Sequence, residues 1–365
     1  MRKIDWYILK KFLVTFFFCM MLFMIVAVAV DSSEKTDDFV KTGLSTGQII
    51  RQYYFGFVPY IWGLLFPLFV FIAVIFFTSR MASRSEIIAI LASGTSYNRM
   101  LRPYFAGGLL LATALWFGQR YLIPRANGIR SDFQSNYIDR NDPSKSANQP
   151  TCINCFYRRI DSSTYIGIKG YDTATKMANQ FFMEKVKDGK VIYNLRSNSA
   201  KWDTAIKKWT LMNAVERKID SMKETTTEHP SLTLNISLKP EELSRDEYLK
   251  DRLSTPRLVA FIEREELRGT EGLSVLKVER YRRTATPFAV LLLTIIGVVI
   301  ASRRNRGGSG MHLAIGIITA ALFIVSDRFS TVFATKSNFP PLLAAWLPNI
   351  AFSFVAFLMY RKTPK

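Results

Sequence analysis

Long runs of uncharged apolar residues constrain the fold of this chain more than any other feature. Three runs contain no charged residue and cover positions 12–30, 53–77 and 339–360. Three weaker runs cover positions 104–118, 284–302 and 311–325, and the last continues to position 334. About 20 apolar residues suffice for a helix to cross a bilayer. We therefore predict an integral membrane protein with six spanning helices. The first run is longer than a signal-peptide core and no small-residue cleavage site follows it, so we expect it to be retained.

The distribution of charge predicts the topology of these spans. The chain carries a formal net charge of +20. Basic residues gather before the first span, between the second and third, between the fourth and fifth, and after the sixth, whereas the loop at 31–52 has more acids than bases. By the positive-inside rule both termini are cytoplasmic and the long segment from about 124 to 283 lies on the other side. This charge pattern therefore indicates membrane topology and does not indicate nucleic-acid binding.

The long segment between the third and fourth spans has the pattern of β structure. Short alternating or apolar stretches are separated by turn signals such as Asp188-Gly189 and Asp203-Thr204. The stretches lie at 164–168, 180–186, 191–195, 200–202, 208–211 and 231–238. Their spacing is typical of a sandwich or jelly roll, with Trp202 and Trp209 packed in its core. We expect the divisions 1–123 for the first three spans, 124–245 for the β domain, 246–283 for a connecting segment with an amphipathic helix, and 284–365 for the last three spans.

Between the second and third spans lies a short amphiphilic segment, positions 80–103. Ser83 and Glu86 have the spacing of a capping box, and Gly94 stands where a left-handed residue ends a helix, so we predict a helix at about 84–93. Ile87, Ile88, Ile90 and Leu91 give it an apolar surface, but it is too short to cross a bilayer. Two interpretations stay open. The helix rests at the membrane surface as a connector, or it couples the membrane domain to a cytoplasmic motor.

Few residues suggest catalysis or metal binding. The chain has two histidines and neither an HExxH nor a GxSxG motif, and no Gly-Lys-Ser/Thr follows the glycine-rich stretch at 307–310. Cys152 and Cys155 form a lone CxxC, for which a local disulfide or two unpaired thiols are better interpretations than zinc. Asp327 and Arg328 are ionisable residues within the fifth span. They indicate either a contact with a neighbouring helix or a substrate path.

The order of these elements and three local strings resemble a known family. The strings are Ile4-Asp-Trp-Tyr-Ile8 before the first span, the segment at 86–94, and Tyr281-Arg-Arg-Thr-Ala-Thr-Pro287 entering the fourth span. Together with the helix order, they resemble the LptF/LptG permeases of lipopolysaccharide transport over nearly the whole chain. The resemblance implies six transmembrane helices with a periplasmic all-β jellyroll inserted between helices three and four, in a multi-pass protein of the bacterial inner membrane.

The resemblance also implies partners and a role. Such a permease pairs with a second similar permease and with two copies of the ATPase LptB, and extracts lipopolysaccharide from the inner membrane. Its jellyroll joins a periplasmic bridge with LptC and LptA. No cofactor is expected on this chain, because ATP and Mg²⁺ bind the ATPase. The resemblance places the ATPase-docking surface at Glu86, Ile87, Ile90, Leu91 and Gly94.

A path for the lipid is implied along the first and fifth helices. Phe23, Ile25, Phe323 and Asp327 are the expected path positions, and a cationic rim suited to phosphates is expected from Lys35, Lys41, Arg51, Arg280 and Arg283. Two other classes of function stay open. One is a permease for another lipid or for a lipoprotein, and the other is a membrane anchor or sensor with a periplasmic binding domain.

Overall fold

The chain folds into a helical unit and a sheet unit, as a computed structural model shows. The model describes residues 3–139, 156–161, 163–172, 175–187, 189–204, 206, 208–220, 223–236, 248–267, 272–302, 308–337 and 339–362. The helical unit comprises Met1–Ile138, Lys250–Val259 and Ser274–Lys365, and the sheet unit comprises Asp139–Leu249 and Ala260–Leu273.

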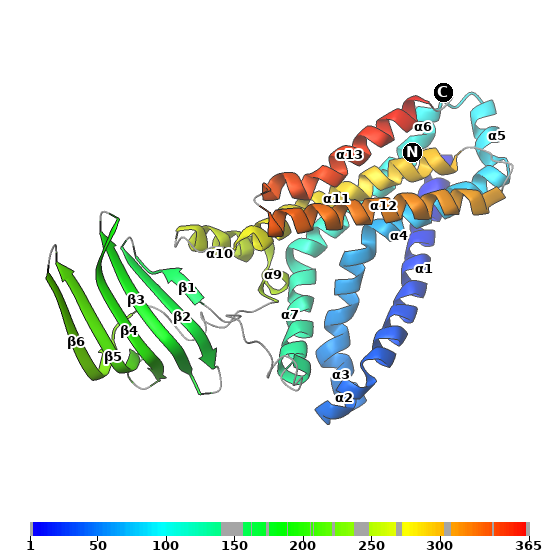
Figure 1. The fold of residues 1–365 in the computed structure, drawn as a ribbon. Coiled ribbons are helices and arrows are strands. Elements are labelled where there is room, and N and C mark those ends of the chain that lie inside the picture. The colour runs from blue at the N-terminus through cyan, green and yellow to red at the C-terminus, as the bar shows by residue number, and fades with distance from the viewer. Residues whose placement is uncertain are drawn as a thin grey trace. The chain divides into compact units, whose positions relative to one another are not determined.

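Six helices are long and apolar enough to cross a membrane, which confirms the prediction (Figure 1). They are built on α1 (Lys3–Glu34), α4 (Phe55–Ser83), α6 (Tyr97–Phe117), α11 (Ser274–Ala301), α12 (Gly308–Lys336) and α13 (Pro341–Arg361). Helix α4 is preceded by α3 (Thr46–Ile49) and the π-helical turn η1 (Ile50–Tyr54). Helix α6 continues through η2 (Gly118–Leu122), α7 (Ile123–Phe133) and η3 (Gln134–Ile138), beyond the expected division at 123. Shorter helices are α2 (Thr36–Thr42), α5 (Glu86–Ala92), α9 (Leu249–Arg252) and α10 (Thr255–Leu267).

Helices α4 and α11 form the centre of the helical unit. In their most apolar windows, 61% of α4 and 72% of α11 is buried, whereas only 11% of α1 and 17% of α12 is buried. Helix α11 packs against α4, α6, α12 and α13, and Figure 1 shows α11, α12 and α13 side by side. Because most of α1 and α12 is apolar and uncovered by this chain, these surfaces require lipid or another protein around them.

The sheet unit contains one antiparallel sheet of six strands. They are β1 (Phe156–Arg159), β2 (Thr164–Asp172), β3 (Met177–Lys187), β4 (Lys190–Asp203), β5 (Lys208–Asp220) and β6 (Lys223–Leu234). Strands that follow one another in sequence are neighbours in the sheet. The all-β domain between the third and fourth spans is thus confirmed. Trp209 is fully buried and packs edge-on against Trp202 at 5.3 Å, as expected for core residues.

One line across this sheet interrupts the alternation of side chains in every strand from β2 to β6. The residues on this line are Lys169, Gln180, Asn198, Asn213 and Pro230, and their neighbours on either side are paired across the strands. Gln180 and Asn213 have left-handed backbone angles, with φ of 50° and 52°. The buried residues on either side of the line lie three positions apart, as in Ala178 and Phe181. The pairing register is unchanged across the line because each strand has the same extra residue, and the apolar side chains stay on one face.

Candidate functional site

Helix α5 is the short amphiphilic helix predicted between the second and third spans. It covers Glu86–Ala92 rather than 84–93, and Gly94 has the predicted left-handed conformation, with φ of 82°. The predicted capping box is wrong. Ser85, with φ of 60°, precedes the helix without a side-chain cap, and the Ser83 hydroxyl donates to the Arg80 carbonyl at 2.9 Å. The left-handed turn at Ser85 moves Ser83 out of capping range of the helix.

The apolar face of α5 packs against its own chain. Ile87 is only 2% exposed and belongs to the same core cluster as Tyr97 and Met100, and the half-buried Ile90 and Leu91 pack on that cluster. These three positions share one face of a helix because they are spaced by three and four residues. Ile87 therefore presents no surface to a partner, contrary to the expectation for it.

The other face of α5 is free in this chain. Ile88 is 47% exposed, and Ala89 and Ala92 beside it are also exposed. Glu86 is partly exposed, and within the described part of the chain no hydrogen bond or ion pair of its carboxylate occurs. Helix α5 thus offers a small apolar surface flanked by one unpaired carboxylate.

The residues that follow α5 are bound to the ends of three other helices. The hydroxyls of Tyr97 and Ser302 are hydrogen-bonded at 3.1 Å, which connects α6 to the end of α11. The Tyr360 hydroxyl of α13 donates to the side-chain oxygen of Asn98. Arg99 lies 3.6 Å from the Asp5 carboxylate of α1. The start of α6 therefore joins α5 to α1, α11 and α13, and no sequence pattern predicted this junction, which depends on residues up to 262 positions apart.

At the other end of α1, a buried ion pair involves one of the predicted rim cations. The Lys35 ammonium lies 3.2 Å from the Asp31 carboxylate, and the Tyr53 hydroxyl donates to the same oxygen at 3.0 Å. Asp31 is 9% exposed. The charge of Lys35 is therefore compensated within the chain. Lys41 and Arg51, two further predicted rim residues, are exposed.

Arg283 is an anchor inside the helical unit and not an accessible rim residue. Its side chain is 6% exposed, and its guanidinium donates to Glu279 at 3.1 Å and to the carbonyls of Leu253 and Lys250 at 2.7 Å. The expectation of a free cation here is wrong because helix α11 turns this position toward α9 and the start of α10. The neighbouring predicted cation, Arg280, is half-buried over its own neighbour Tyr281.

The predicted path residues lie in different surroundings. Asp327 of α12 pairs with Arg282 of α11 at 3.2 Å, so it has the neighbouring-helix contact that its position suggested. Phe323 packs on Phe352, with ring centroids 5.1 Å apart, and Phe23 packs on Phe69 at 4.8 Å. Ile25 is 65% exposed on α1. Cys152 and Cys155 lie outside the described residues.

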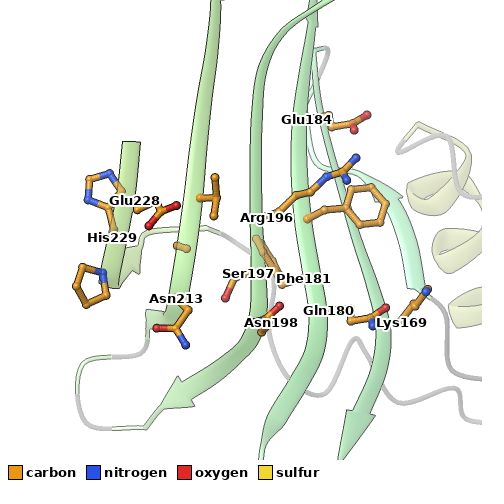
Figure 2. A pocket seen from close by; sticks show the side chains of 14 residues that line it. Lys169, Gln180, Phe181, Glu184, Arg196, Ser197, Asn198, Asn213, Glu228 and His229 are labelled. Carbon is orange, nitrogen blue, oxygen red and sulfur yellow. The ribbon is translucent and has the colours of Figure 1, made fainter. Parts of the chain in front are cut away.

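The sheet unit has a groove of about 1110 Å³ along the interrupted line of its strands. Figure 2 shows Lys169, Gln180, Asn198 and Asn213 following one another across adjacent strands. The hydroxyl of Ser197, beside this line, lies 2.7 Å from the carbonyl oxygen of Ser199 and 2.6 Å from that of Met212, and these two acceptors share its single hydrogen. This groove therefore combines polar side chains of the line with apolar ones such as Phe181 and Val215.

Comparison with known proteins identifies the family. The family model of the lipopolysaccharide export system permease LptF/LptG matches residues 6–362. No curated protein matches the sequence significantly. The family match covers all six candidate spans and the inserted sheet. The chain therefore belongs to the LptF/LptG family of lipopolysaccharide export permeases and is a multi-pass protein of the inner membrane.

Proposed function

We propose that this chain is one permease subunit of an ABC transporter that extracts lipopolysaccharide and passes it to a periplasmic bridge. The observation that carries the proposal is the family match over residues 6–362. The chain also has six candidate spans, with the short helix α5 between the second and the third. A separate LptB-like ATPase dimer supplies ATP hydrolysis, and both termini and α5 face the cytoplasm. This orientation follows from the basic residues that flank the spans on that side.

The free face of α5 is the docking surface for the ATPase in this proposal. It consists of Ile88, Ala89 and Ala92, with Glu86 and Gly94 at its two ends. Small and apolar side chains allow α5 to enter a groove, and the unpaired Glu86 suits a cation on the partner. The buried stripe of Ile87, Ile90 and Leu91 holds α5 against the membrane domain, so displacement of α5 moves that domain as well.

The uncovered helices α1 and α12 suit a contact with a second, similar permease and with the lipid. Between them they expose large apolar side chains such as Ile25, Phe18 and Phe329. Three predicted path residues lie beside this surface and contact neighbouring helices. Phe23 packs on α4, Phe323 packs on α13, and Asp327 pairs with α11. Of the proposed rim, Lys41 and Arg51 keep exposed side chains for phosphate groups.

The sheet unit suits the bridge with LptC-like and LptA-like proteins. In the described residues, β1 and β6 each pair with a strand on one side only. An edge strand of this kind accepts a strand from another protein through its free N–H and C=O groups. A chain of such sheets would continue the groove of this one toward the outer membrane.

The test is affinity purification of the full-length protein in mild detergent, with an ATPase assay in the presence and absence of lipopolysaccharide. We expect an ATP-binding subunit and a second permease to co-purify, and lipopolysaccharide to stimulate hydrolysis. Ile88→Arg should abolish ATPase recovery, and Glu86→Arg should reduce it to a smaller extent. Val40→Arg is the matched control, because Val40 is 75% exposed on α2 at the opposite end of α1.

A chain that purifies without an ATPase in several detergents would instead support the anchor or sensor function. Stimulation by another lipid but not by lipopolysaccharide would support a permease for that lipid. Normal ATPase recovery and normal transport by Ile88→Arg would show that α5 docks by another face.

A further inference from the structure

A polar cavity of about 190 Å³, partly open to the surface, lies in the helical unit between α4, the α6–α7 helix, α9, α11 and α12. Its lining contains the four cations Lys250, Arg282, Arg283 and Arg328, against the two carboxylates Asp251 and Glu279. Arg283 is saturated by its own bonds, and Arg282 is paired with Asp327. The Asp251 carboxylate offsets one of the two remaining charges, those of Lys250 and Arg328, so the lining keeps an excess of one positive charge and favours an anion.

The same cavity contains buried acceptors without donors. Gln119 Oε1 and Asn127 Oδ1 are buried and have no hydrogen-bond partner among the residues that the structure describes, and Asn127 as a whole is 5% exposed. Buried amide oxygens are almost always hydrogen-bonded in folded proteins. An anion that also carries hydrogen-bond donors, such as hydroxyl groups, fits both features.

An apolar cavity of about 120 Å³ adjoins the polar one. The two cavities lie side by side between α4, α11 and α12 and share four lining residues, which are Leu64, Arg282, Thr286 and Arg328. The remaining lining of the second cavity is mainly hydrocarbon, including Leu68, Ala289 and Ala320. The Arg282–Asp327 pair stands at the boundary between the polar and apolar compartments.

We propose that these two compartments bind one anionic glycerophospholipid with a hydroxylated head group, of the phosphatidylglycerol type. Its phosphate would pair with Arg328 and Lys250, its glycerol hydroxyls would donate to Gln119 and Asn127, and the start of an acyl chain would enter the apolar cavity. The bound lipid joins α4, α7, α11 and α12 and so stabilises the helical unit.

The size and position of the site favour a phospholipid over the exported lipid. At about 30 Å³ per water molecule, the polar cavity holds the volume of about six waters. That volume suits a phosphoglycerol group. The lining residues lie between helices of this chain's own bundle. The inference concerns a resident lipid and does not depend on which lipid the transporter exports.

The experiment is native mass spectrometry of the delipidated full-length protein, titrated with phosphatidylglycerol and, separately, with phosphatidylethanolamine. We expect a first phosphatidylglycerol to bind more tightly than later copies and more tightly than phosphatidylethanolamine. Arg328→Gln should weaken this first binding by about tenfold. Because Arg328 is exposed, we expect this variant to fold normally, so that weaker binding reports on the site itself. Arg120→Gln removes an equal charge beside Gln119, but Arg120 packs on Trp116 and Tyr121 outside the cavity, so its binding should equal that of the wild type.

A second variant tests the apolar compartment. Ala320→Leu fills that cavity without changing charge and should also weaken the first binding, with thermal unfolding as the check on its fold. Equal weakening by Arg120→Gln and Arg328→Gln would overturn the proposal, because it would show general attraction of anionic lipid to a basic protein. Stoichiometric displacement of the first phosphatidylglycerol by lipopolysaccharide would overturn it as well, since the cavity would then belong to the export path. These outcomes are independent of ATPase recovery and so are separable from failure of the proposed function.

Discussion

Gly56 of α4 allows the second span to approach α7, the continuation of the third span, closely. A Cβ atom at this position would lie 2.4 Å from the Ala126 carbonyl oxygen and 2.6 Å from the Arg130 nitrogen of α7. Both contacts are with backbone, so no side chain can rotate away. Because contacts below 3.0 Å essentially do not occur, α7 would have to retreat by at least about 0.6 Å. Overpacking of this kind costs about 1–3 kcal/mol, and the better helix propensity of alanine offsets about 1 kcal/mol of it.

We therefore expect Gly56→Ala to lower the free energy of unfolding by up to about 2 kcal/mol. Gly128→Ala is the matched control on α7, because a Cβ there would meet no atom within 4 Å. It should leave stability unchanged or raise it by up to about 1 kcal/mol. Thermal unfolding of the full-length protein in detergent, followed by tryptophan fluorescence, measures both variants. Equal midpoints for the two variants would refute the close approach of α4 and α7.

Three further predictions concern single residues. Arg283→Met should lower the free energy of unfolding by about 3 kcal/mol, because removal of the guanidinium leaves the half-buried Glu279 carboxylate and two carbonyls without their donor. Arg283→Lys should not restore this stability, and chemical denaturation of both variants checks the prediction. Ser197→Ala should cost about 1–2 kcal/mol through the lost bonds to Ser199 and Met212, whereas Ser199→Ala should cost little, and thermal unfolding compares them. The backbone N–H of Ser163, aided by Thr164, holds the pKa of Asp161 below its usual range, so its contribution to stability is present above the unfolded pKa and is lost as pH falls through the folded pKa. Asp161→Ala should remove that part of the acid dependence, as unfolding midpoints measured from pH 5 to pH 2 would show. An unchanged acid dependence in this variant would contradict the prediction.

The helices were predictable from sequence because each depends on a local property. An uncharged apolar run of sufficient length specifies a spanning helix whatever surrounds it, and all six were found. The existence of α5 and its end at Gly94 were also local features. The contact made by its apolar face was not, because a stripe at Ile87, Ile90 and Leu91 shows that a face will be buried but not which surface buries it.

The sheet shows the same limit in another form. The stretches at 191–195 and 200–202 were predicted as separate strands, but both belong to the single strand β4. Between them β4 crosses the interrupted line at Asn198, and only the pairing of β3 and β5 on either side shows that the strand continues. Strand β1 was not predicted, since its four residues, Phe156–Arg159, have no alternating pattern. Contacts such as Asp31 with Tyr53 likewise depend on how helices are placed and not on any local pattern.

The contacts around α5 indicate which helices would follow it if an ATPase moved it. Tyr97, Asn98 and Arg99 lie directly after α5 and bind the ends of α11, α13 and α1 respectively. Among the described residues, none of these three side-chain bonds reaches α12. Helix α12 has polar contacts near its other end, where Asp327 pairs with α11 and the Ser330 hydroxyl donates to the Ala344 carbonyl of α13 at 2.6 Å. Nearer its start it is packed into the core, because His312 is 2% exposed and Gly316 lies against Ile75 of α4. A displacement at α5 would thus act first on α1, α11 and α13, and would reach α12 through its packing on α4 and α11 and so change the surface that α1 and α12 present.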